Sequence, residues 1–316
     1  MIRALAITGP TASGKTALSI DLALAVGGEI ISCDSMQIYK EMNIGTAKAT
    51  AEERAAVPHH LVDFLPPNTP YSSDNYRADA LAVARDVVAR GRIPVFVGGT
   101  GLYVDTVARA PLSDVPPSDP DYRERLLATV KTEDDIHALW ERLREVDAES
   151  AEKIHENNVK RVIRALEIYD ATGKPKSYFD EMSRAAVADI SLGMITLDFH
   201  NRELLYSRID ARVDKMLEDG LLDEARSLYE RGLLSSDTTA GQAIGYKELR
   251  GYLDGQMTLR EATESLKLAS RRYAKRQLTW FRGKDAYRLY LDTEDGKMRS
   301  HTEVSAEMLT AARELI

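Results

Sequence analysis

The stretch GPTASGKT, Gly9–Thr16, decides the fold of the first third of this chain. It fits the pattern G-x-x-x-x-G-K-[ST], whose glycines let backbone N–H groups converge on a phosphate at a helix N-terminus. The apolar run ALAI precedes it, and the helix-like ALSIDLALAV follows. In this setting Lys15 would neutralise the outer phosphate and the Thr16 hydroxyl would ligate Mg²⁺. The pattern leaves open whether the phosphate is transferred, hydrolysed or expelled.

The segments around this loop predict an α/β core. Residues 3–9, 29–35 and 93–101 have strand character, and residues 15–26 and 73–90 have helical periodicity. A proline- and acid-rich stretch, 110–126, then leads into purely helical patterns up to about Ala188, and strand character returns at 189–199. We therefore predict a P-loop NTPase-like parallel sheet flanked by helices and interrupted by an all-helical insertion domain. The expected domains are 1–112 (core, first part), 113–190 (helical insertion) and 191–316 (core, second part).

Composition indicates a globular cytoplasmic protein. The chain has 316 residues, of which 44% are apolar and 29% charged, and a net charge of −8. The single cysteine, Cys33, excludes an intramolecular disulfide and a cysteine-based metal cluster. Neither a signal peptide nor an apolar run long enough to span a bilayer is visible. We expect a monomer in the cytoplasm without membrane association.

Two polar positions follow predicted strands and are candidates for chemistry. Asp34, in CDSMQIYK, lies where ligands bind in open α/β sheets, so its carboxylate could bind Mg²⁺ or accept a proton. A turn or helix-capping role is the alternative. Thr100 follows Gly98-Gly99, where an ATPase usually carries its magnesium-binding acid. Asp198 at another strand end could replace that acid, although strand-end aspartates are common.

Basic residues gather on two predicted helices. In residues 271–284, six are basic and none is acidic. At 100° per residue, one side of this helix carries the charges and the other carries Tyr273, Gln277, Trp280 and Phe281. We expect the aromatic side to be buried and the basic side to contact phosphates, with a merely solvated surface as the alternative. In the insertion, Asn157, Arg161 and Arg164 similarly share a face. By contrast, His59 and His60 lack a third metal ligand nearby and read as structural, and Cys33 reads as a small buried residue.

Taken together, these segments resemble the bacterial tRNA dimethylallyltransferase (tRNA isopentenyltransferase, or IPP transferase) family over nearly the whole chain. The resemblance rests on a set of motifs that occur in order, namely GPTASGKT, ISCDSMQIYKEMNIGTAK, PHHLVD, VGGTGLY, RALEIY, RIDARVDKMLEDGLLDEA, AIGYKEL and AKRQLTWFR. A phosphate loop alone would not separate this family from kinases, but GTAK, GGTGLY and KRQLTWFR do.

The resemblance implies transfer of the prenyl group of dimethylallyl diphosphate to N6 of adenosine 37 in tRNA, with diphosphate released and Mg²⁺ as cofactor. It implies catalytic roles for Asp34, Thr100 and Arg212. The implied diphosphate site is Gly9, Pro10, Thr11, Ala12, Ser13, Gly14, Lys15 and Thr16, and Thr16 is the implied metal ligand.

The implied tRNA contacts fall on three parts of the chain. In the first part of the core they are Asp34, Ser35, Met36, Gln37 and Thr100. On the insertion, expected to clamp the anticodon stem, they are Arg123, Asn157, Asn158, Val159, Lys160 and Arg161. In the last part they are Gln242, Ala243, Ile244, Gly245, Tyr246 and Lys247, and the basic helix adds Arg272, Lys275 and Arg276. One departure is Asn157-Asn158, where the family commonly has Asn-Asp or Asp-Pro.

Three alternatives remain open at this point. An adenylate isopentenyltransferase, acting on free AMP, ADP or ATP, would share the core but needs neither the insertion nor a basic helix. A small-molecule P-loop kinase would use the same loop for ATP. A non-enzymatic RNA-binding protein would leave the loop and Asp34 idle.

Overall fold

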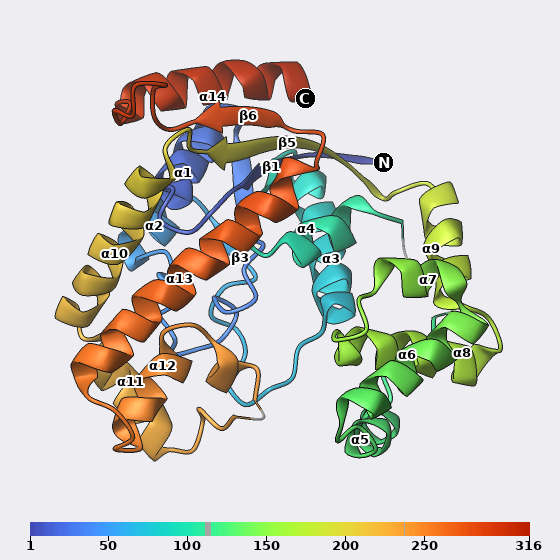
Figure 1. Cartoon of the computed structure of the whole chain (residues 1–316). Helices are drawn as coiled ribbons and strands as arrows, with labels where there is room; N and C mark the ends of the chain where they lie inside the picture. The colour runs from blue at the N-terminus through green and yellow to red at the C-terminus, as the bar shows by residue number, and fades with distance from the viewer. Residues whose placement is uncertain (111–114, 237) are drawn as a thin grey trace. The chain divides into compact units, whose positions relative to one another are not determined.

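The protein divides into two compact units. The computed structural model describes residues 1–110, 115–236 and 238–316 (Figure 1). The core unit comprises Met1–Ala108 and Asp189–Ile316, and the insert unit comprises Arg109–Ala188. The expected boundary at 112/113 lies outside the described residues. Within the described ranges, no helix is long and apolar enough to cross a membrane.

Six parallel strands form the sheet of the core unit, in the order β3-β2-β4-β1-β5-β6. The strands are β1 (Ile2–Thr8), β2 (Gly28–Ser32), β3 (His59–His60), β4 (Ile93–Gly98), β5 (Ile190–Asp198) and β6 (Tyr287–Tyr290). In the middle of the sheet, Leu5 lies opposite Val95 on one side and Gly193 on the other. The predicted parallel α/β core is thus confirmed. The sequence pattern did not reveal β6, because four residues are too few to show a period.

Helices cover both faces of this sheet. Leu5 and Ile7 of β1 belong to one apolar cluster, and Ala4 and Ala6 to another, as the period of two along a strand requires. The first cluster includes residues of α1 (Lys15–Val26), α10 (Arg202–Glu218) and α14 (His301–Leu315), and the second includes residues of α3 (Ser73–Ala89) and α4 (Gly101–Ala108). Because both faces are covered, the carboxyl ends of the strands are left for a ligand.

A third apolar cluster joins the segment after β2 to the C-terminal helices. Ile38, Tyr39 and Met42 are buried against α10, α11 (Leu221–Glu230), α12 (Tyr246–Leu253) and the start of α13 (Leu259–Arg282). A short helix, α2 (Ala51–Ala56), leads into β3, and a 3₁₀ turn, Ala240–Gln242, precedes α12. This cluster places α10, α13 and the turn beside the phosphate loop.

Arg77 of α3 links the two ends of the core chain between which the insert unit lies. Its Nε donates to the Thr106 carbonyl at 3.0 Å, and its guanidinium pairs with Asp189 at 2.7 Å. Ile2 N also donates to the Asp189 carbonyl at 2.8 Å. The departure and return of the chain are therefore fixed within the core unit itself.

The described elements of the insert unit are all helical, as its sequence pattern predicted. They are α5 (Pro120–Ala128), α6 (Glu133–Val146), α7 (Ala148–Lys153), α8 (Val159–Thr172) and α9 (Lys176–Ala185). Leu139 and Leu143 of α6 pack with Val162 and Leu166 of α8 in a separate small core. Apolar residues of α5 and α7 also contribute to this core.

Candidate active site

The phosphate loop connects β1 to α1 in a conformation that depends on glycine. Gly9 has φ 141°, and a Cβ there would lie 2.8 Å from the Leu197 carbonyl oxygen. Gly14 caps α1 in the left-handed region, and no side chain caps the helix. Ser13 Oγ donates to the Pro10 carbonyl at 2.8 Å and closes the loop on itself. The first N–H groups of α1 are therefore available to an anion, as the pattern predicts.

Three cations converge on this loop. Lys15 Nζ donates to the Gly9 and Pro10 carbonyls at 3.1 and 2.6 Å, and Arg208 Nε donates to the Ala12 carbonyl at 3.0 Å. Removal from water and repulsion by Arg212 lower the pKa of Lys15 to about 7, against the attraction of Asp34. Burial also lowers the pKa of Arg212, which makes no hydrogen bond or ion pair to any residue that the structure describes. A bound polyanion would relieve this repulsion.

Asp34 and Thr100 lie side by side at the carboxyl ends of β2 and β4. Asp34 Oδ1 accepts from the backbone N–H groups of Met36 and Gln37, at 2.8 and 3.3 Å. Its other oxygen has no hydrogen-bond partner among residues 1–110, 115–236 and 238–316, so it can accept a proton. Thr100 Oγ1 accepts from Ser35 N at 3.1 Å. Asp34 therefore stabilises a turn through one carboxylate oxygen, which is the alternative role that the sequence left open. Its second oxygen remains available to a ligand.

A cavity of about 350 Å³ joins these groups. It lies within the core unit, and the predicted residues that line it are Thr11, Ala12, Ser13, Gly14, Lys15, Thr16, Asp34, Ser35, Met36, Gln37, Arg212, Gln242, Ala243, Ile244, Gly245 and Arg276. Ile209, Val213, Met216 and Leu266 add an apolar wall. The cavity therefore suits a ligand with an anionic head and a short apolar tail.

Several predicted residues lie outside the cavity wall. The carbonyls of Gly9 and Pro10 accept hydrogen bonds from Lys15. Thr100 Oγ1 accepts one from the backbone N–H of Ser35, which does line the cavity. Tyr246 is fully buried and donates to Glu224 at 2.6 Å, so its side chain offers no surface to a nucleic acid. Lys247, next to it, is exposed.

Gln277 of α13 is the main site residue that the sequence did not identify, although its burial was predicted. It is 5% exposed; its Oε1 accepts from Thr11 N at 2.8 Å, and its Nε2 donates to the Gly99 carbonyl at 3.1 Å. One amide thus joins the phosphate loop to the loop of Thr100. The sequence did contain one indication of this role. Gln277 lies on the buried side of a basic helix, and a buried amide needs hydrogen-bond partners for both its oxygen and its nitrogen.

Tyr273, Ser270 and the loop Gly45–Ala47 also line the cavity and were not predicted as site residues. Tyr273 and Ser270 lie on α13, and Gly45–Ala47 belong to the GTAK motif. Tyr273 is half-buried, and burial raises its pKa to about 12, so it remains a neutral hydrogen-bonding group at physiological pH.

The basic helix differs from prediction on its aromatic side. Phe281 is fully buried, but Trp280 is 37% exposed, so the expected burial of that side was wrong in part. The indole lies against Gly101, where a Cβ would come within 2.4 Å of the ring, and so it covers the start of α4 instead of entering the core. Arg271 pairs with Asp210 at 2.6 Å.

Arg272, Lys275 and Arg276 of α13 are exposed and have no acidic partner among the described residues. Arg276 also lines the cavity and lies 5.6 Å from the ring centroid of Tyr273. A row of unpaired cations beside the cavity suits a phosphate backbone.

The remaining candidates lie in the insert unit. Asn158 caps α8, and Asn157, Lys160 and Arg161 are exposed at its start, beside the half-buried Val159. Arg123 instead donates to the buried carboxylate of Glu167 at 2.9 Å, and Arg164 pairs with the same carboxylate at 2.8 Å. Arg123 and Arg164 therefore also stabilise the fold of this unit.

His60, Cys33 and one ring nitrogen of His59 have partners within the core unit, whereas His59 Nε2 is buried without a hydrogen-bond partner among the described residues. His60 pairs with Glu29 at 2.7 Å, and His59 Nδ1 contacts the Val57 carbonyl at 2.7 Å. Cys33 is buried beside the Tyr76 hydroxyl, and burial raises the pKa of its thiol to about 12. No group of three or more metal-binding side chains occurs in the described part of the chain.

The Thr16 position fits the expected Mg²⁺. Its side chain lines the cavity at the start of α1, and its hydroxyl has no protein partner in the described ranges. Magnesium bound with phosphates typically takes one or two protein ligands and keeps several waters. Asp198 does not supply a second one, because it pairs with Arg288 at 3.1 Å and is absent from the cavity wall.

Known proteins share both the sequence and the fold. The sequence profile of IPP transferase matches residues 37–284, and that of isopentenyl transferase matches residues 2–59. A tRNA dimethylallyltransferase of Geobacillus thermodenitrificans is 52% identical over 277 residues, 87% of this chain and 86% of the relative. That of Geobacillus kaustophilus is 47% identical over 298 residues, 94% of this chain and 93% of the relative.

Solved structures agree. The full-length tRNA isopentenylpyrophosphate transferase of Bacillus halodurans superposes with a TM-score of 0.73 at 43% identity, covering 100% of this chain and 97% of that one. A eukaryotic dimethylallyltransferase, described as acting on tRNA, gives a TM-score of 0.79 at 31% identity, covering 92% of this chain and 74% of that one. The phosphate loop, the available aspartate and the apolar cavity wall are joined in one site. By the sequence and structural matches, the chain belongs to the IPP transferase family.

Proposed function

We propose that the protein transfers the dimethylallyl group of dimethylallyl diphosphate to N6 of adenosine 37 in the anticodon loop of tRNA. The observation that carries this proposal is the cavity itself. Cations and the N-terminus of α1 form one end, apolar side chains form part of the wall, and the Asp34 carboxylate lines the same cavity. A phosphoryl acceptor would need no apolar wall, whereas a five-carbon tail does.

The cationic end would hold the diphosphate and stabilise its departure. Backbone N–H groups of Ser13–Thr16, Lys15 and Arg212 line the cavity where negative charge grows as the allylic C–O bond breaks. Thr16 would hold Mg²⁺, which when bound neutralises part of that charge. Lys15 supports this role: its pKa of about 7 without ligand rises beside an anion, so it is protonated when diphosphate is bound.

Asp34 would act on the adenine. As the C–N bond forms at N6 and the C–O bond breaks, the nucleophile loses one N–H proton, and the unpartnered oxygen of Asp34 can accept it. The backbone N–H groups of Met36 and Gln37 fix the other oxygen. The target base must leave the anticodon-loop stack to reach this site, which costs little in a single-stranded loop.

The exposed cations of α13 favour tRNA over free adenylate. Arg272, Lys275 and Arg276 lie exposed outside the phosphate loop and have no acidic partner in the described ranges, and Lys160 and Arg161 of the insert unit are exposed as well. A nucleotide substrate would need neither. Phosphate contacts of this kind position an RNA without reading its sequence.

The deciding experiment incubates the protein with labelled dimethylallyl diphosphate and Mg²⁺, and offers unmodified tRNA, AMP or ATP as acceptor. Label in tRNA, mapped to N6 of adenosine 37 by nuclease digestion and mass spectrometry, supports the proposal. Label in AMP or ATP would instead assign an adenylate isopentenyltransferase. Hydrolysis of ATP without prenyl transfer would return the protein to the kinase alternative.

A further inference from the structure

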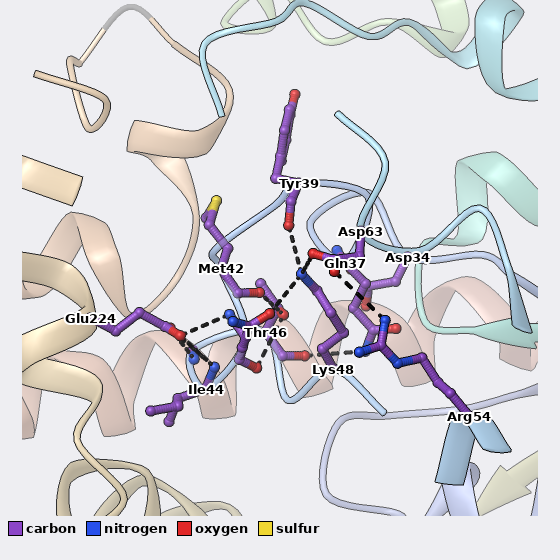
Figure 2. Close-up of polar contacts among 12 residues, drawn as sticks. Asp34, Gln37, Tyr39, Met42, Ile44, Thr46, Lys48, Arg54, Asp63 and Glu224 are labelled. Carbon is purple, nitrogen blue, oxygen red and sulfur yellow. Dashed lines mark hydrogen bonds and ion pairs between the residues drawn. The ribbon is translucent and has the colours of Figure 1, made fainter. Parts of the chain in front are cut away.

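A single carboxylate, Glu224 of α11, holds the loop that forms one side of the cavity. Its two oxygens accept from three consecutive backbone N–H groups, those of Asn43, Ile44 and Gly45, at 2.9–3.1 Å. The Tyr246 hydroxyl donates to the same carboxylate at 2.6 Å. Figure 2 shows Glu224 pointing at this loop from a helix far along the sequence. Three converging N–H groups form an anion-binding recess, and here a side chain of the protein occupies it.

The far end of the same loop is fixed by Lys48. Its side chain is 2% exposed, and Nζ donates to the Tyr39 carbonyl at 2.7 Å and to Asn43 Oδ1 at 2.9 Å (Figure 2). An ion pair with Asp63 at 2.6 Å balances its charge. A buried ammonium with three partners is satisfied, so Lys48 is a structural cation and not a ligand for substrate.

Between these two anchors, the loop presents Gly45, Thr46 and Ala47 to the cavity. Gln37 Nε2 donates to the Thr46 and Ala47 carbonyls, both at 3.2 Å. The backbone N–H of the same Gln37 donates to Asp34 Oδ1 at 3.3 Å. Gln37 therefore connects the loop to the Asp34 carboxylate. Ala47 has φ 46°, a conformation that an L residue adopts only when its surroundings impose it.

We propose that Glu224 is a positioning residue for the transfer reaction, which holds Asn43–Lys48 as a preformed cavity wall and, through Gln37, fixes the orientation of Asp34. This role rests on the proposed function, because it concerns the same cavity and the same aspartate. Glu224 is absent from the residues that line the cavity, so we assign it a positioning role and not a catalytic one. A wall already in place when the allylic diphosphate arrives saves the entropy of ordering it during binding.

The test is the isosteric variant E224Q. An amide keeps the shape of Glu224 but has one acceptor oxygen, so its NH₂ group must face a backbone N–H that it cannot bond. We expect faster amide hydrogen exchange in a peptide covering residues 42–48, with exchange in β1 unchanged. We also expect kcat/KM for dimethylallyl diphosphate to fall by about tenfold or more. The matched control is E230Q on the same helix, an exposed glutamate without a partner in the described ranges.

The two readouts separate the possible outcomes. Unchanged exchange in E224Q would overturn the claim that Glu224 holds the loop, and faster exchange with normal transfer would overturn its positioning role. If E224Q does not fold, Y246F removes only one of the donors to the carboxylate and should give the same two changes, smaller in size. Normal exchange and normal transfer in Y246F would then refute the proposal. A wild-type protein without prenyl transfer would refute the proposed function, while exchange would still report on the loop.

Discussion

Replacing Gln277 by glutamate should make prenyl transfer depend on pH in a way the wild type does not. The substitution keeps the size of the side chain and its acceptor toward Thr11 N. It removes the N–H that binds the Gly99 carbonyl at 3.1 Å and, once ionised, sets two oxygens against each other at a site that is 5% exposed. A buried acceptor left without a donor costs ~1–3 kcal/mol. If that cost falls on the transition state, kcat/KM falls by about 5- to 150-fold.

The sign of the pH effect follows from the same geometry. When the carboxyl group of Q277E is protonated, it can donate to the Gly99 carbonyl and accept from Thr11 N, so it restores both contacts of the amide. Burial raises the pKa of such a carboxyl group above its ordinary value of about 4.3. The ratio of Q277E to wild-type kcat/KM should therefore be highest at low pH and fall as pH rises through that raised pKa.

The assay is steady-state prenyl transfer between pH 5 and pH 8, with Q256E as the matched control. Gln256 is exposed just before α13, so the same change of charge there should leave the ratio flat. Melting temperatures of each variant at each pH separate unfolding from misplacement. A Q277E ratio that is flat with pH and equal to that of Q256E would refute the role of Gln277 in joining the two loops.

Other parts of the structure lead to three further predictions. D34N should keep tRNA binding but lower turnover by roughly 10²–10⁴-fold, the usual contribution of a general base, and near-normal turnover would remove Asp34 from that role. The triple variant R272A/K275A/R276A should weaken tRNA binding and lessen its salt dependence, measured by filter binding across salt concentrations; an unchanged slope would make this face of α13 a merely solvated surface. E29Q should lower Tm at pH 7, and the difference from wild type should shrink as pH falls below 4.5: the Arg90 hydrogen bond holds the pKa of Glu29 below that ordinary value, so its contribution is full above it and is lost on protonation. A difference that stays constant down to pH 3, relative to E230Q, would contradict this assignment.

The sequence predicts those parts of the protein whose conformation depends on residues close together in the chain. The turn of the phosphate loop needs Gly9 and Gly14 because of backbone geometry, and β1 alternates between two apolar faces, so both are readable without a structure. Gln277 and Glu224 act through partners more than 170 positions away, and no spacing rule relates such residues. Trp280 was misplaced for a related reason, since the space that its ring takes is created by Gly101 on another helix.

The contacts of Arg77 with Thr106 and Asp189 have a consequence for the evolution of such proteins. Because Arg77 holds Thr106 and Asp189 to one guanidinium, the ends of the inserted segment are anchored whether or not that segment is folded. The entropy of closing the insertion is thus offset by the core, and it grows only slowly with the length of what is inserted. We therefore expect changes in the length of the insert unit to leave the geometry of the cavity in the core unit largely unchanged. Substitutions in the insert unit and substitutions around the cavity of the core unit can therefore be selected independently of each other.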